Sequence, residues 1–231
     1  RSGGDGSVGS GGWFNIIEKF AKAKAYCDHP FEFRHNGVCK ERVDIAHEWI
    51  GDESNGRGQV PSRTVSIACA DASQQAIPAA SLDAVFTDPP YFGNVQYAEL
   101  MDFCYVWLRR LTKSKLHGFE QLTTRSKNEL NGNASQSRGL EHFTEGLSIV
   151  YRKMAHALKD GAPLAFTYHH NKLEAYFAVG VAILDAGLTC SASLPCPAEM
   201  GGSIHIHGTA SSIVDTVFVC RDRGQARRQW L

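Results

Sequence analysis

Residues 85–91 read Val-Phe-Thr-Asp-Pro-Pro-Tyr, which places an acid, two prolines and an aromatic ring at the end of a short apolar run. Residues 84–87 are apolar or β-branched, as expected of a buried strand, and proline lacks the backbone N–H that a sheet requires. The strand must therefore end before Pro89. This places Asp88 and Tyr91 at the carboxyl end of a strand, where ligands bind in open α/β sheets.

Such a turn suits a flat heterocycle that carries an exocyclic amine. The lone pair of that amine is delocalised into the ring, so the amine is a poor nucleophile until acceptors engage its two protons. The Asp88 carboxylate and the Pro89 carbonyl can each accept one proton, and Tyr91 offers a π-face for stacking, worth about 1–3 kcal/mol. The group attacked would be a methyl on a sulfonium, because direct displacement needs no covalent enzyme intermediate. The alternative is a Pro-Pro turn with Asp88 as a local cap.

The sequence around this turn resembles the amino-methylating DNA methyltransferases. It looks most like the bacterial, zinc-ribbon-associated adenine-specific DNA methylases, whose full-length members are long, multi-part proteins. The resemblance covers roughly residues 60–222 and rests on TDPPYFGNVQYAELMDFCYVWLRRL at 87–111, ALKDGAPLAFTYHH at 157–170 and GTASSIVDTVFVCR at 208–221.

The resemblance implies which residues bind the target base and the methyl donor. The catalytic and target-base motif would be Asp88, Pro89, Pro90 and Tyr91. The residues beside the substrate would be Phe92, Asn94 and Tyr97. The residues that contact the adenosine of the cofactor S-adenosylmethionine would be Asp71 and Ala72, in CADAS. An equally open interpretation makes Asp71 only the cap of the turn that follows it.

Strands and helices alternate along the chain, which favours a three-layer α/β sheet. The expected helices are residues 13–26, 97–111, 140–158 and 173–186. The expected strands are residues 65–70, 82–87, 164–168, 188–194 and 214–220. Helix 97–111 is apolar nearly all round, which predicts a packed core helix. The last two strands have no helix between them, which suggests the antiparallel terminal hairpin of a Rossmann-like methyltransferase sheet.

Two strands of the resembled sheet have no counterpart in this inventory. They carry the glycine-rich cofactor turn and the acid that binds the ribose, so the expected sheet is incomplete. Gly4 to Gly9 formally matches G-x-G-x-x-G, but no buried strand precedes it, and residues 1–12 have the composition of a flexible linker. We therefore expect a carboxyl-terminal piece of a longer methylase, in agreement with a first residue that is not Met.

The expected organisation has four parts. A flexible Gly/Ser-rich segment covers residues 1–12, and a helix plus linker covers 13–60. The carboxyl-terminal part of the catalytic domain covers 61–222, and a tail covers 223–231. Residues 27–60 are mixed and polar and suggest no regular element.

A basic stretch follows the helix at 97–111. From Arg109 to Arg138 there are seven basic and two acidic residues, although the formal net charge of the whole chain is zero. The stretch is rich in Ser, Asn, Gly and Thr, which predicts a long exposed loop over 112–140. It either contacts the DNA backbone or is merely solvated. The candidate DNA contacts are Lys113, Lys115, Arg125 and Lys127.

Composition fits a soluble, cytoplasmic enzyme piece. The 231 residues are 43% hydrophobic, enough for one substantial core. No apolar stretch reaches the ~20 residues of a membrane span, and no signal-peptide pattern opens the chain. Seven cysteines form no C-x-x-C pair, which argues against a disulfide framework or a zinc ribbon.

Three other groups of residues invite chemistry. Cys196 follows a proline, as a cytosine ring-carbon nucleophile does, but that reaction has no use for the Asp-Pro-Pro-Tyr turn. His205 and His207 could join His169 and His170 around a metal. Zinc sites need three or four ligands with defined surroundings, and methyl transfer needs no metal. We therefore predict no metal site and expect polar surface histidines.

Two classes of function remain. The first is S-adenosylmethionine-dependent methylation of an exocyclic amine in DNA, N6 of adenine before the cytosine amine, in a restriction-modification or phage-defence setting. The second is a non-catalytic DNA- or partner-binding piece that lacks the methyl-donor loop and joins an amino-terminal part or a partner subunit. Related turns also serve methylation of RNA bases and protein amides, where Asn more often replaces the acid at position 88.

Overall fold

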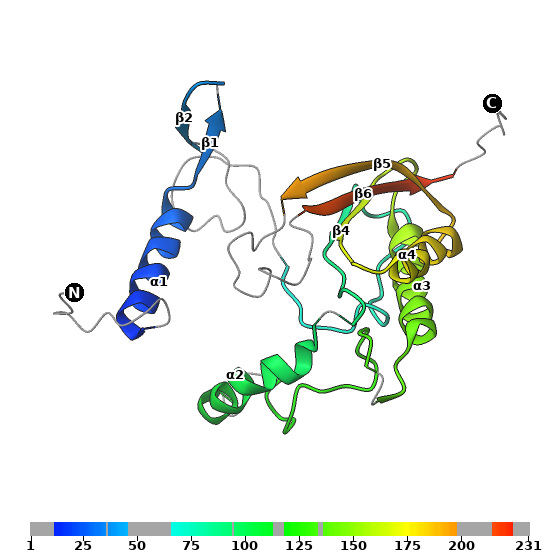
Figure 1. Ribbon diagram of the computed structural model, residues 1–231, viewed down its shortest axis with the longest axis horizontal. Coiled ribbons are helices and arrows are strands. Elements are labelled where there is room, and N and C mark those ends of the chain that lie inside the picture. Colours follow the sequence, from blue (N-terminus) through cyan, green and yellow to red (C-terminus); the bar gives the residue numbers. More distant parts are fainter. Residues whose placement is uncertain are drawn as a thin grey trace. The chain divides into compact units, whose positions relative to one another are not determined.

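The computed structural model describes residues 12–35, 37–45, 66–93, 95–112, 118–133, 136–197 and 214–223. The chain divides into two compact units, Arg1–Cys69 and Ala70–Leu231. Figure 1 shows their helices and strands.

The first unit contains one helix and one hairpin. Helix α1 spans Trp13–Asp28, as predicted, and no residue of it is buried. Strands β1 (Phe31–His35) and β2 (Lys40–Asp44) pair antiparallel. The sequence analysis missed this hairpin because 27–60 is polar overall. The missed signal was the alternation Phe-Glu-Phe before the Asn-Gly at 36–37, which is typical of a hairpin turn.

The second unit is built on a four-stranded sheet in the order β3-β4-β6-β5. Strands β3 (Val85–Thr87) and β4 (Leu164–Tyr168) are parallel. Strands β5 (Leu188–Pro197) and β6 (Val214–Asp222) form the predicted terminal antiparallel pair, and β6 also lies antiparallel to β4. The mixed α/β class and this hairpin are confirmed.

Helices α3 (Leu140–Ala157) and α4 (Leu173–Asp185) pack against each other and cover one face of the sheet (Figure 1). On β4, every second side chain faces them, and Leu164, Phe166 and Tyr168 are buried in the shared core. The buried face of α3 follows helical spacing and includes Phe143, Leu147, Val150 and Tyr151. This core fixes the carboxyl ends of β3 and β4.

The opposite face of the sheet is shallowly hollowed in the described part of this unit. A depression of 380 Å³ is lined in part by Phe86, Ala165, Thr167 and Val217. Phe86 and Leu194, which share this face, are exposed. The described helices thus give two layers, sheet and helix pair, where three were expected.

Two expectations for this unit were wrong. The strand expected at 65–70 does not form within residues 66–70, which are exposed and without regular structure, because no described strand lies beside them to supply hydrogen bonds. Helix α2 (Tyr97–Thr112) forms as predicted, but only Ala98 and Tyr105 are buried. Its apolar residues indicated a core helix, whereas its described contacts cover only one side.

Candidate functional site

The Asp-Pro-Pro-Tyr turn leaves the carboxyl end of β3 beside the end of β4. Thr87 pairs with Phe166, so the two parallel strands end at the same sheet edge. The Asp88 side chain is exposed, and its Oδ1 accepts a hydrogen bond from the Thr167 hydroxyl. This bond orients the carboxylate, which also takes part in a hydrogen bond with the Tyr91 hydroxyl.

Tyr91 is half-buried beside Asp88. Its ring lies 5.2 Å from that of Tyr168, centroid to centroid, at 60°. Burial raises the pKa of Tyr91 to about 12, a hydrogen bond to Thr167 opposes this, and the negative charges of Asp88 and Asp215 add to it. The Tyr91 hydroxyl, Thr167 and Asp88 therefore form one cluster. Tyr91 lines neither the 380 Å³ depression nor the two cavities beside Asp71.

Tyr97 begins α2 and belongs to the same electrostatic neighbourhood. Burial raises the pKa of its hydroxyl, a hydrogen bond with the Tyr91 backbone opposes the rise, and the Asp88 carboxylate adds to it. The structure therefore brings Tyr97 near the predicted catalytic acid. Phe92 packs at 5.4 Å on the Phe143 ring, centroid to centroid, and so anchors the turn to α3.

Asp71 lies at the junction of two cavities. A cavity of 480 Å³ is lined by Asp71 to Gln74, by Pro90, by Asn128 and Leu130, and by α3 residues between His142 and Val150. Another of 450 Å³ is lined by Asp71, Tyr97, Ala98 and residues of the 124–129 loop. The predicted cofactor acid and the Pro-Pro turn thus line one cavity, and Ala72 lines it with them.

Asp71 also makes the alternative contact that the sequence suggested. Its Oδ1 accepts a hydrogen bond of 2.8 Å from the Ser73 N–H, and its backbone carbonyl accepts one from Gln74. The hydrogen bonds to Ser73 lower the pKa of Asp71. The cap closes a single turn with no helix after it.

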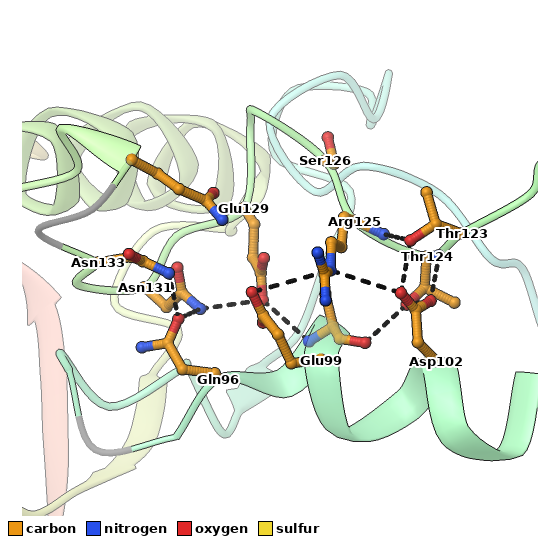
Figure 2. A network of polar contacts seen from close by, with 12 residues as sticks. Gln96, Glu99, Asp102, Thr123, Thr124, Arg125, Ser126, Glu129, Asn131 and Asn133 are labelled. Carbon is orange, nitrogen blue, oxygen red and sulfur yellow. Dashed lines mark hydrogen bonds and ion pairs between the residues drawn. The ribbon is translucent and has the colours of Figure 1, made fainter.

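A polar network ties the loop after α2 back to the start of that helix (Figure 2). Glu129 lies at its centre. One of its oxygens accepts from the Ala98 N–H at 3.2 Å and from Asn131 at 3.0 Å, and the other pairs with Arg138 at 3.2 Å. Gln96 accepts from Asn131 and Asn133 and donates to the Gly132 carbonyl at 2.7 Å.

The other end of the network contacts α2 at Asp102, one helical turn after Ala98 (Figure 2). Asp102 accepts hydrogen bonds from the Thr123 hydroxyl, the Thr124 N–H and the Thr124 hydroxyl. The bond from Thr123, followed by the one from the Thr124 backbone, lowers the pKa of Asp102. These bonds hold the walls of the 450 Å³ cavity, because Thr124 and Glu129 both line it.

This network corrects the expectation of a wholly exposed basic loop. Residues 121–128 are exposed, but Asn131, Gly132 and Arg138 are buried. Polar composition suggested exposure, whereas Gln96 binds Asn131 and Gly132 and Glu129 binds Asn131 and Arg138. Arg125, a predicted DNA contact, lies 3.5 Å from Asp102 and 3.9 Å from Glu99, so acids partly neutralise its charge. Lys127 is exposed.

Several predicted residues lie outside the described part of the chain. They are Asn94, Lys113, Lys115, His205, His207 and the glycines at 4–9.

In the described part, no group of three or more His, Cys, Asp or Glu side chains is placed to hold a metal. No described helix is long and apolar enough to cross a membrane. Cys196 is a half-buried free thiol on β5, opposite Asp215 of β6.

Sequence reasoning missed two residues that shape this site. Thr167 orients Asp88, and His170, expected on the surface, is buried beside the Phe92 carbonyl. Both lie at the end of β4. The parallel pairing of β3 with β4, rather than any local motif, brings them to the turn.

Comparison with known proteins identifies no family. No family model matches the sequence, and no curated protein matches it. Among solved structures, the chain is similar to crystal structures of TTHA0409 from Thermus thermophilus, named a "putative DNA modification methylase". One has 16% identity over 70% of this chain and 55% of that chain, with a TM-score of 0.39. Another, complexed with S-adenosyl-L-methionine, has 17% identity over 69% and 56%, with a TM-score of 0.36. The chain thus spans about half the length of these structures. Similarity at this level identifies neither a family nor an activity.

Proposed function

We propose that this protein takes part in S-adenosylmethionine-dependent methylation of an exocyclic amino group in DNA, N6 of adenine before the cytosine amine. We also propose that the sheet is part of a three-layer, Rossmann-like methyltransferase fold. The observation that carries it is the exposed Asp88 carboxylate at the end of a parallel strand, held by Thr167 and followed by two prolines.

The chain's own groups would activate the amine. The Asp88 carboxylate and the Pro89 carbonyl would accept hydrogen bonds from its two N–H groups, which would localise the lone pair on nitrogen. When bound, S-adenosylmethionine supplies a methyl on a sulfonium, which becomes a thioether as the N–C bond forms. The nitrogen then carries one proton too many, and Asp88 passes that proton to solvent.

The described residues fit a donor with an adenosine group. Cavities of 450 and 480 Å³ lie in the size range of small-molecule sites. Asp71 lines both and can accept from ribose hydroxyls or the adenine amine. Gln74, Asn128 and His142 add donors and acceptors to the larger cavity. We propose that Asp71 and Ala72 hold the adenosine and that Asn94 and Tyr97 flank the target base. The Phe92 ring, packed on Phe143, would support the turn instead of the base.

DNA is the proposed macromolecular partner. Lys113, Lys115, Arg125 and Lys127 would bind its phosphates, and such interactions weaken as salt rises. For Arg125 this requires that its guanidinium leave Asp102, to which it is bound only at the exposed surface. Each substitution that removes one phosphate interaction should reduce the slope of the logarithm of the binding constant against the logarithm of the salt concentration by about one.

A methyl-transfer assay tests the proposal. Labelled S-adenosylmethionine is offered with DNA, RNA and protein substrates to the full chain. We expect label in DNA, and a loss of about 10²–10⁴-fold in rate for Asp88→Ala. Asp83→Asn is the matched control. Asp83 is also an exposed acid, it lies two residues before β3, and it pairs with Lys159 away from the turn. An Asp88→Ala protein that methylates at the wild-type rate would refute the mechanism. Label found in RNA or protein, and not in DNA, would show that DNA is not the substrate.

A further inference from the structure

The end of β4 holds the catalytic turn at three successive points. The Thr167 hydroxyl donates to Asp88, the Tyr168 ring packs on Tyr91, and His170 contacts the carbonyl of Phe92. Pro89 and Pro90 have no N–H, so the turn itself offers no backbone donor at these positions. Its shape therefore depends on groups from the neighbouring strand end.

The contacts of His170 determine which ring nitrogen carries the proton. The residue is only 9% exposed. The Lys172 backbone N–H lies 2.9 Å from Nδ1, and a backbone N–H can only donate, so Nδ1 is the acceptor. The proton is then on Nε2, which lies 2.6 Å from the Phe92 carbonyl oxygen and donates to it. The neutral ring thus links the β4–α4 connection to the catalytic turn.

Phe92 is confined on its other side as well. Its ring packs on Phe143, and a Cβ placed on Gly132 would lie 2.7 Å from the same ring. Gly132 is itself held by Gln96. With the ring enclosed, the carbonyl oxygen of Phe92 is held by His170, while the Phe92 backbone also takes part in a hydrogen bond with the Tyr168 hydroxyl. A change at His170 should therefore move the backbone of the turn and leave the ring in place.

We propose that His170 is a positioning residue. Its Nε2–H fixes the Phe92 carbonyl, and this sets the backbone that presents Asp88 and the Pro89 carbonyl. The catalytic consequence rests on the proposed function, whereas the hydrogen bond and its effect on the turn do not. His170 is assigned no contact with the proposed base or the donor and acts only through the turn.

Three substitutions separate the two contacts of the ring. His170→Gln keeps a side-chain N–H at about the reach of Nε2. His170→Asn keeps an acceptor near the Lys172 N–H but does not reach Phe92. His170→Phe keeps the ring volume and loses both hydrogen bonds. His169→Gln is the matched control, because that neighbouring histidine contacts only Asn171 among its described side-chain partners.

The hydrogen bond can be measured without any activity. Phe92–Gly93 is the single Phe-Gly pair in the sequence. Labelling Phe at the carbonyl carbon with ¹³C and Gly with ¹⁵N therefore gives one HNCO peak that reports the Phe92 carbonyl. We expect the carbonyl shift to move upfield in the Phe and Asn variants and to stay near wild type in the Gln variant and the His169 control. An unchanged shift in the Phe and Asn variants would overturn the inference. If the Phe variant does not fold, the Asn variant gives the same comparison.

The catalytic consequence is measured on the same proteins. A small misplacement of reacting groups can cost about 10²-fold in rate, so we expect kcat to fall by about that factor in the Phe and Asn variants. KM should change little, and His170→Gln should recover most of the rate. If the Phe92 carbonyl shift moves in the Phe and Asn variants but kcat is equal in all variants, the positioning role is overturned. Wild-type protein without methyl transfer to any substrate would refute the proposed function, and the carbonyl shift would still decide whether His170 sets the turn.

Discussion

The two halves of the second unit are held together by different kinds of contact. Around β4, aromatic and aliphatic side chains of α3, α4 and the sheet form a continuous buried core. Around α2, most contacts are carboxylates, amides and hydroxyls of the loop that follows it (Figure 2), beside one stacked ring pair, Tyr105 and Phe119. Apolar burial supplies most folding free energy, so the first region should set global stability and the second should open more readily.

The difference matters because the candidate site lies between these regions. Asp88 and Tyr91 are held by β4, in the apolar half. Tyr97 and the walls of the 450 Å³ cavity belong to the polar half. Polar networks are directional, so they can fix a cavity wall closely, but each bond gains little net free energy because water competes for it. The Asp88 carboxylate should therefore be held rigidly, whereas the walls of the 450 Å³ cavity should be able to move.

The largest expected effect is on the core. Phe166 is 2% exposed and packs against Tyr151 and Phe218. Phe166→Ala removes these contacts and leaves a cavity, so we expect the free energy of unfolding to fall by about 3–5 kcal/mol. Urea unfolding followed by circular dichroism measures it.

Phe103→Ala on α2 is the matched control. This ring is 76% exposed, and surface substitutions usually change stability by no more than about 0.5 kcal/mol. A comparable loss in both variants would mean that α2 is covered by something other than the described contacts, and the contrast between the two regions would fail.

A local effect, confined to one region, is expected from the polar half. The Arg138 side chain is 6% exposed and pairs with Glu129, and removing one partner of a buried pair typically costs about 3–5 kcal/mol. In Arg138→Met we expect amide hydrogen exchange across 97–112 and 118–133 to accelerate by about 10²-fold or more. Exchange in α3 and α4 should stay unchanged, because the apolar core does not depend on this pair.

Arg125→Met, in the same loop, sharpens that result. Its side chain is 57% exposed where it meets Asp102, and exposed ion pairs contribute about 0–1 kcal/mol. Exchange should therefore accelerate by less than about tenfold. Uniform acceleration across both regions in Arg138→Met would show a single cooperative unit instead of two regions of different stability.

The sequence predicted the apolar half well and the polar half poorly, for a physical reason. Strand β4 and helices α3 and α4 carry their burial in local patterns of apolar residues, which periodicity reveals. Asn131 is buried where Gln96 and Glu129 accept hydrogen bonds from its amide, and Arg138 is buried where its guanidinium pairs with Glu129. Polar residues look the same in sequence whether water or protein completes their hydrogen bonds, so the loop was predicted to be exposed.

The site divides in the same way. The end of β3 at Pro89 followed from the missing proline donors alone. Thr167 lies 79 residues from Asp88, the acid it orients, and His170 is equally remote from Phe92. Nothing local marks either residue, because the register of β3 on β4 creates both contacts. Strand pairing, once known, would have pointed to the residues that follow β4.

The smallest expected effect is a gain in the apolar half. The Tyr151 hydroxyl is buried and has no hydrogen-bond partner among the described residues, and an unsatisfied buried polar group costs about 1–3 kcal/mol. Tyr151→Phe should therefore raise the free energy of unfolding at neutral pH by about 1 kcal/mol. Phe143→Leu, a change of shape at an equally buried ring, is the control and should be destabilising.

The same variant should change the response to alkali. Burial raises the pKa of Tyr151, so the native state keeps this proton at a pH where the unfolded chain has begun to lose it. Stability is then fully present below pH ~10, the ordinary tyrosine pKa, and decreases as pH rises above it. Tyr151→Phe should flatten that decrease but not abolish it, because burial also raises the pKa values of Tyr91 and Tyr168 to about 12. Urea unfolding at several pH values between neutrality and pH ~11 provides the comparison. An unchanged alkaline slope, or a loss of stability at neutral pH, would mean that the Tyr151 hydroxyl has a partner that the apolar packing conceals.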